Sequence, residues 1–108
     1  MAGHRYCQVV TTTDSRQAAE ALAAGAVRAR AAACAQVIGP ITSTYWWEAK
    51  IASAEEWQVV FKTEFGRYPA LEEHIRAHHS YDVPEILCTP VITGNQTYLD
   101  WVSAETAG

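Results

Sequence analysis

The chain has 108 residues, with 12 acidic and 8 basic side chains and a formal net charge of −4 at pH 7. A chain of this length forms one domain and buries roughly 65% of its unfolded surface, which is enough for a core without cross-links. The acidic balance excludes most nucleic-acid binding modules, since their affinity comes mainly from Lys and Arg on phosphates. With 49% hydrophobic and 19% charged residues, the composition is not that of a disordered protein.

The sequence predicts a cytoplasmic protein without a membrane span. No apolar run approaches the ~20 residues that a bilayer helix needs. The first residues lead directly into a strand-like segment, without the apolar run of a signal peptide. Cys7, Cys34 and Cys88 are widely separated and form no Cys-x-x-Cys pair. We therefore expect three reduced thiols, buried as small apolar side chains.

The first part of the chain predicts a strand followed by a helix. Residues 6–13 are rich in β-branched side chains, and Asp14 and Ser15 are suitable N-caps for a helix over residues 16–31. A stripe of mainly small residues along this helix predicts close packing against a sheet: Ala18, Leu22, Gly25, Ala26 and Ala29. Gly25 is unfavourable inside a helix, so close approach of a neighbouring element is its expected role.

A hairpin that is long for so small a domain follows the helix. Residues 33–51 form an extended segment, broken once by Gly39-Pro40, and a turn over 52–55 leads into the second segment, 56–63. Arms of about ten residues span ~30 Å. We therefore expect the rest of the domain to leave part of this hairpin uncovered.

The last part of the chain predicts a helix, an edge strand and a short closing helix. Pro69 suits the first turn of a helix that ends near His79. Residues 85–93 are rich in β-branched side chains and contain a proline, which predicts an edge strand. A turn and cap at 94–95 precede three residues at helical spacing, namely Tyr98, Trp101 and Val102.

The order of elements is β-α-β-β-α-β with a C-terminal helix. This order is typical of the α+β ferredoxin-like fold, the split βαβ arrangement, in which helices cover one face of an antiparallel sheet. The second and fourth strands are then the edges of the sheet, and they contain Pro40 and Pro90. We predict one domain over residues 1–108.

Several stretches resemble the CutA divalent-cation tolerance family in their order and spacing. They are residues 32–37 (AACAQV), 43–51 (STYWWEAKI), 62–63 (KT), 78–86 (HHSYDVPEI) and the closing 98–101 (YLDW). The resemblance covers residues 6–103 and implies a ferredoxin-like subunit in a tight homotrimer, similar in architecture to the PII nitrogen-signalling proteins. It implies a role in tolerance and binding of copper and other divalent metal ions. It brings no agreed catalytic activity, and the sequence carries no nucleophile elbow or phosphate-binding loop, so we expect no enzyme.

The candidate metal ligands are His78 and His79, because imidazole suits copper, zinc and nickel. The resemblance implies a copper site made of this pair and a cysteine at the end of the first strand, a place that Thr11 takes here. Neighbouring helical residues point about 100° apart, so both imidazoles reach one ion only where the helix frays. The structural alternative is that His78 packs on the core and His79 caps the helix. Glu85 is a candidate third ligand or a hydrogen-bond partner of the loop.

Tyr45, Trp46, Trp47 and Trp57 are the second group of candidate residues. Alternation along an extended segment places Trp46 and Trp47 on opposite faces, so one side of a small domain cannot bury both. The same alternation places Lys50 on the face of Trp46. Aromatic side chains are favoured at subunit interfaces, and we expect at least one of the four between subunits of the trimer.

These observations lead to three hypotheses. The first is a cytosolic homotrimer that binds divalent metal ions, copper among them, loosely and as part of metal tolerance, with no cofactor required. The second is a PII-like sensor whose clefts between subunits bind a small anionic molecule or a partner protein. The third is a structural trimer that acts as a scaffold for another protein. None of them involves nucleic acid or a membrane.

Overall fold

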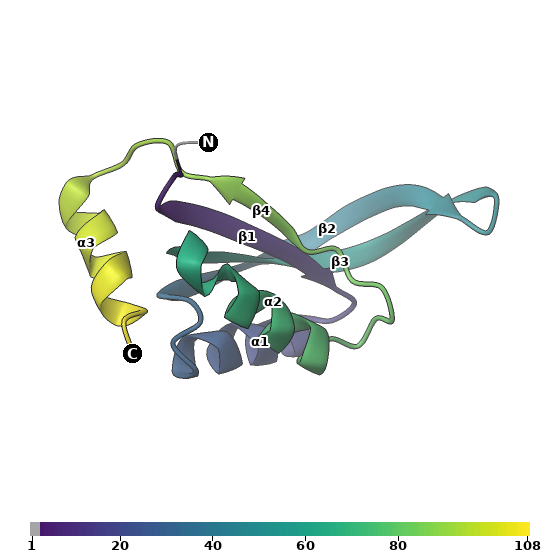
Figure 1. Ribbon diagram of the computed structural model, residues 1–108. Helices are drawn as coiled ribbons and strands as arrows, with labels where there is room; N and C mark the ends of the chain where they lie inside the picture. The colour runs from purple at the N-terminus through teal and green to yellow at the C-terminus, as the bar shows by residue number, and fades with distance from the viewer. Residues whose placement is uncertain (1–2) are drawn as a thin grey trace.

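Residues 3–108 fold into four strands, three helices and a short 3-10 turn (Figure 1). In chain order these are β1 (Tyr6–Thr13), α1 (Arg16–Arg28), β2 (Cys34–Trp47), β3 (Lys50–Glu64), η1 (Phe65–Arg67), α2 (Tyr68–His78), β4 (Leu87–Pro90) and α3 (Gln96–Glu105). The computed structural model describes residues 3–108, so the first two residues of the predicted domain lie outside the described part. No described helix is long and apolar enough to cross a membrane.

The predicted α+β fold with an antiparallel sheet is confirmed. The strand order is β2-β3-β1-β4, and every neighbouring pair is antiparallel. The edges are β2 and β4, as predicted. Helices α1 and α2 cover one face of the sheet, whereas α3 lies at the end where β1 begins (Figure 1).

The main core lies between the sheet and the two covering helices. Ser15 is the N-cap of α1, and its side chain accepts a hydrogen bond from the amide of Ala18 at 3.0 Å. The helix ends at Arg28, three residues earlier than predicted, because Arg30 takes a left-handed conformation with φ of 62°. The largest buried side chains come from β1, β3, α1 and α2, and they include Val9, Val59, Phe61, Leu22, Leu71 and Ile75.

Gly25 is explained by helix packing. A Cβ atom at this position would lie 2.9 Å from Cε1 and Nε2 of His74 on α2. The close approach expected at Gly25 is therefore present, but the neighbour is the second helix and not the sheet. The three buried residues of α1 are Ala19, Leu22 and Ala26, so the predicted stripe is only partly correct.

The β2–β3 hairpin turns at Glu48 and Ala49, and the predicted turn over 52–55 is wrong. Residues 52–55 belong to β3 and pair with β2. Glu48 and Ala49 have φ of 50° and 64°, the positive pair that a two-residue type I′ turn requires. Sequence reasoning missed this turn because neither position carries the Asn or Gly that normally marks it.

The shifted turn also changes which side chains share a face. Trp46 pairs with Ile51 across the hairpin, and Trp47 pairs with Lys50. Directly opposite residues of an antiparallel pair lie on the same face. The prediction that Lys50 shares the face of Trp46 is therefore wrong.

A bulge interrupts β2 at Gly39-Pro40. Ile38 pairs with Gln58, but Ile41 pairs with Glu56, so β2 carries one extra residue here. A Cβ atom on Gly39 would lie 2.6 Å from Cδ1 of Trp57, and this explains the glycine.

Helix α3 is attached to the sheet through Glu64. Arg5 Nε donates to Glu64 Oε2 at 2.7 Å, and the Ser103 hydroxyl donates to the same oxygen. The Tyr6 hydroxyl lies 2.8 Å from Ser103 Oγ. Partial burial opposes ionisation of Glu64, but the hydrogen bonds from Ser103 and Arg5 outweigh it and lower the pKa of this carboxyl.

We predict that Ala49→Gly stabilises the protein by about 1 kcal/mol, because glycine removes the steric cost of a positive φ. The free energy of unfolding from denaturant titration measures the effect. Ala52→Gly, within β3, is the matched control and is expected to destabilise. Equal effects of the two substitutions would show that the turn is not at residues 48–49.

We also predict that the ionised carboxylate of Glu64 stabilises the fold and that acid removes this stabilisation. Because its pKa is lowered in the folded state, its contribution is present above the ordinary value of about 4.5 and is lost as pH falls below it. Denaturant unfolding of the wild type and Glu64→Gln across this range tests the assignment. The free energy of unfolding of the wild type should exceed that of Glu64→Gln above pH 4.5, and the difference should shrink at lower pH. A difference that does not change with pH would exclude this role of Glu64.

Candidate functional site

The imidazole of His79 contacts the end of β1. Its Nε2 lies 2.8 Å from the carbonyl oxygen of Thr12 and 3.1 Å from Oγ1 of Thr11. The backbone N–H of Tyr81 donates to Nδ1 at 3.0 Å. A carbonyl oxygen only accepts, so Nε2 carries the proton and Nδ1 is the acceptor. Both nitrogens of His79 are therefore engaged within the chain.

His78 lies elsewhere, on the exposed side of α2. Its Nδ1 donates to the carbonyl oxygen of His74 at 2.8 Å, and the two imidazole rings are 4.4 Å apart between centroids. The side chain is exposed, so the structural alternative in which His78 packs on the core is wrong. His79 does occupy the C-cap position of α2, although its ring is bonded to β1.

The predicted metal ligands do not gather around one point. Among residues 3–108, no three His, Cys, Asp or Glu side chains are placed to hold one metal ion. Glu85 therefore does not complete a set with His78 and His79, and it lines a groove instead. The fully buried Thr11 does contact His79, so these two predicted positions come together in space.

The cysteines are all free, as predicted. The expectation that all three are buried is correct only for Cys7 on β1, because Cys34 and Cys88 are only partly buried. Burial raises the pKa of the Cys7 thiol to about 12, with a smaller contribution from Cys88. Cys7 is therefore protonated at neutral pH, as expected of an inert core thiol.

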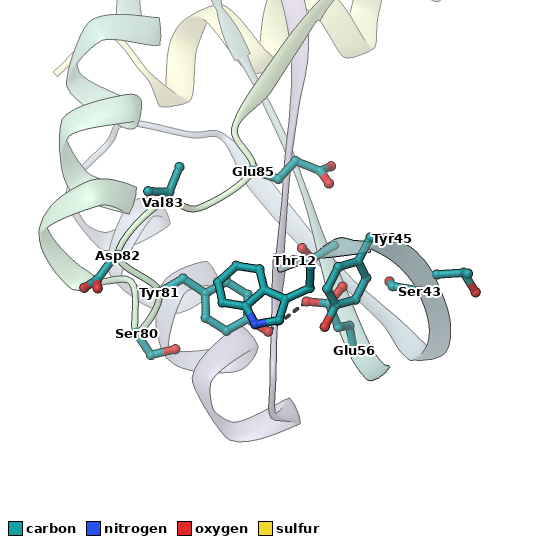
Figure 2. A pocket seen from close by; sticks show the side chains of 11 residues that line it. Thr12, Ser43, Tyr45, Glu56, Ser80, Tyr81, Asp82, Val83 and Glu85 are labelled. Carbon is teal, nitrogen blue, oxygen red and sulfur yellow. Dashed lines mark hydrogen bonds between the residues drawn. The ribbon is translucent and has the colours of Figure 1, made fainter. Parts of the chain in front are cut away.

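A groove of about 850 Å³ lies between the hairpin and the loop after α2 (Figure 2). Strands β2 and β3 form one side, and residues 80–85 form the other. Aromatic rings and carboxylates dominate its lining, among them Tyr45, Trp47, Glu56, Tyr81, Asp82 and Glu85.

Glu56 and Tyr81 join the two sides of this groove. The Tyr81 hydroxyl donates to Oε2 of Glu56 at 2.8 Å (Figure 2). Burial, and then the hydrogen bond to Glu56, raise the pKa of Tyr81, so its phenol remains a donor at neutral pH. Sequence reasoning did not single out either residue. The available signal was that Tyr81 lies within the family-like stretch of residues 78–86.

The aromatic residues of the hairpin differ in their surroundings. Trp46 is 73% exposed and Trp47 is 63% exposed, while Tyr45 is 43% exposed. Trp57 is partly buried against the main core and fills the space beside Gly39. In the single chain, the hairpin tip therefore carries one area of uncovered apolar surface, and further exposed apolar side chains lie after α2 and around β4, including Val83 and Ile92.

The sequence pattern of the family described as CutA1 divalent ion tolerance protein matches residues 7–105. The chain belongs to the CutA1 family. The divalent-cation tolerance protein CutA of Thermus thermophilus is 36% identical over 98 residues, which cover 91% of this chain and 95% of that protein. Protein CutA 1, chloroplastic, of Oryza sativa subsp. japonica is 37% identical over 98 residues, but this chain spans only 55% of its length.

Solved CutA structures share this fold. CutA1 from Oryza sativa has a TM-score of 0.92 and 34% identity, with 94% of each chain covered. CutA from Synechococcus elongatus PCC7942 has a TM-score of 0.91 and 32% identity, over 98% of this chain and 94% of that one. The family predicted from the sequence is thus confirmed. The names of these CutA relatives refer to divalent-cation tolerance or to the family, and not to an enzyme activity.

Proposed function

We propose that this protein is a cytosolic, non-enzymatic homotrimer that binds divalent metal ions loosely in metal tolerance, with copper as the first ion to test. Membership of the CutA1 family supports the role in tolerance. The contact between Thr11 and His79 supports the metal-binding part, and the uncovered hairpin supports the trimer.

The apolar surface of the single chain favours assembly. Trp46 and the 67% exposed Ile51 form a cross-strand pair on one face of the hairpin. On the other face of the sheet, opposite the core, Val10 pairs with both Val60 and Leu87 in a separate apolar row. Covering one indole removes on the order of 200 Å² from water, worth several kcal/mol at ~25 cal/mol per Å² as an upper value.

The two sheet edges favour a closed ring. The outer side of β2 runs over 14 residues, whereas β4 has four. A contact of β2 in one copy with β4 in the next is heterologous, and contacts of this kind form a ring where the rotation between copies closes. A closed ring leaves no exposed edge for aggregation.

We predict that light scattering after size exclusion gives about three times 11.9 kDa and that this mass persists on dilution. Trp46→Glu should dissociate the assembly, because a carboxylate cannot be buried unpaired at low cost. Val27→Glu, on the exposed side of α1, is the matched control and should leave the mass unchanged. A monomeric wild type would refute the trimer.

The residues at the end of β1 fit only a weak metal site. Nε2 of His79 can bind an ion only after its proton and its bond to Thr12 are given up. The Thr11 hydroxyl is a poor ligand for a soft cuprous ion. His78 lies apart from this site, on the exposed side of α2, and would bind an ion separately through Nε2, since its Nδ1 is already bonded to the His74 carbonyl.

We predict that replacing both His78 and His79 with Ala weakens Cu²⁺ or Zn²⁺ binding in calorimetry, because they are the only two histidines that are consecutive in the sequence and imidazole suits these ions. His4→Ala is the control. Unchanged affinity in the double variant would remove the metal assignment.

A gain-of-function variant tests the same site. Thr11→Cys places a thiol beside His79 and should tighten cuprous binding, whereas Thr11→Ser should not. No difference between these two variants would mean that the contact of Thr11 with His79 does not form a metal site.

The second candidate function is a PII-like trimer that binds a small molecule or a partner protein. The groove in Figure 2 favours it, because its volume is that of a small-ligand site. Its lining contains three carboxylates and no Lys or Arg. This charge disfavours the anionic ligand expected from the sequence.

A further inference from the structure

We propose that the groove between the hairpin and residues 80–85 binds a small organic cation, of the linear polyamine class. The inference goes beyond metal tolerance, and it uses neither His78 nor His79. It rests on a buried carboxylate without a cationic partner, on the aromatic walls around it, and on the shape of the groove.

Glu56 is a buried carboxylate without a cationic partner in the described chain. It is only 9% exposed and points into the groove from β3 (Figure 2). Its one side-chain hydrogen bond in the described chain comes from the neutral Tyr81 hydroxyl, and it forms no ion pair there. Buried carboxylates are normally paired with a cation, so a positively charged ligand would supply what the chain does not.

The walls of the groove suit an ammonium group joined to an alkyl chain. Tyr45, Trp47 and Tyr81 contribute aromatic rings from β2 and from the loop. Cations are attracted to the faces of such rings, and the rings also cover methylene groups. The hydroxyls of Ser43 and Ser80 add acceptors for N–H groups.

The distribution of the carboxylates favours an extended cation over a metal ion. Glu56 lies on β3, and Asp82 and Glu85 lie on the opposite loop. In the described part of the chain, no three acidic or imidazole side chains are close enough to hold one ion. A volume of about 850 Å³ accommodates a chain of several methylene groups with an ammonium group at each end.

The test is calorimetric titration of the full-length protein with spermidine, with Trp fluorescence as a second readout. We expect saturable binding, weakened about tenfold or more by Glu56→Gln, which keeps the side-chain shape and removes its charge. Trp47→Leu should also weaken binding several-fold, and light scattering must show that its mass equals that of the wild type, since Trp47 is also a candidate interface residue. Glu20→Gln, on the exposed side of α1, is the matched control and should bind as the wild type.

The controls separate this site from general electrostatics and from the proposed function. An uncharged diol of similar length should not bind, and Mg²⁺ at equal ionic strength should not displace spermidine. Absence of saturable binding, or wild-type affinity in both Glu56→Gln and Trp47→Leu, would overturn the inference. The mass and the Cu²⁺ affinity of the same samples test the proposed function. A failure of the proposed function can therefore be told apart from a failure of the cation site.

Discussion

The pairing of β2 with β3 determines most of what is unusual about this subunit. The ladder runs from Cys34 opposite Lys62 to Trp47 opposite Lys50, but β1 pairs with β3 only from Trp57 onward. The outer part of the hairpin is thus a two-stranded ribbon beyond the four-stranded sheet (Figure 1). Isolated two-stranded ribbons are marginally stable in water, and this one exposes two indoles. The face of the ribbon that carries Trp46 and Ile51 therefore needs a covering partner, and the trimer we propose provides one, whereas Trp47 lies on the other face and lines the groove.

The ribbon also forms one side of the groove. Glu56 stands where β3 leaves the ribbon and gains β1 as a neighbour, and Tyr81 reaches it from the loop after α2. His79 fixes the start of that loop, because its ring accepts from the Tyr81 amide and donates to Thr12. One imidazole thus connects the end of β1, the loop and the groove. A change that frees His79 for metal would also loosen the attachment of Tyr81.

The sequence was sufficient for the fold but not for the site. Alternation and capping residues such as Ser15 predicted the order of elements, because that order depends on local spacing, and both edges then followed from the split βαβ topology. The turn was missed since Glu48 and Ala49 are not typical of positive φ, and tertiary pairing overrides their preference. The pairing of Tyr81 with Glu56 joins residues 25 positions apart, and no local pattern reports such a contact.

Amide hydrogen exchange of the full-length protein tests most directly whether other copies cover the ribbon. If other copies cover the ribbon, amides of residues 41–47 and 50–56 exchange as slowly as those of β1, and Trp46→Glu makes the ribbon amides exchange fast while β1 stays protected. Fast exchange of the ribbon in the wild type, beside a protected β1, would show that it is uncovered in solution and would contradict the account.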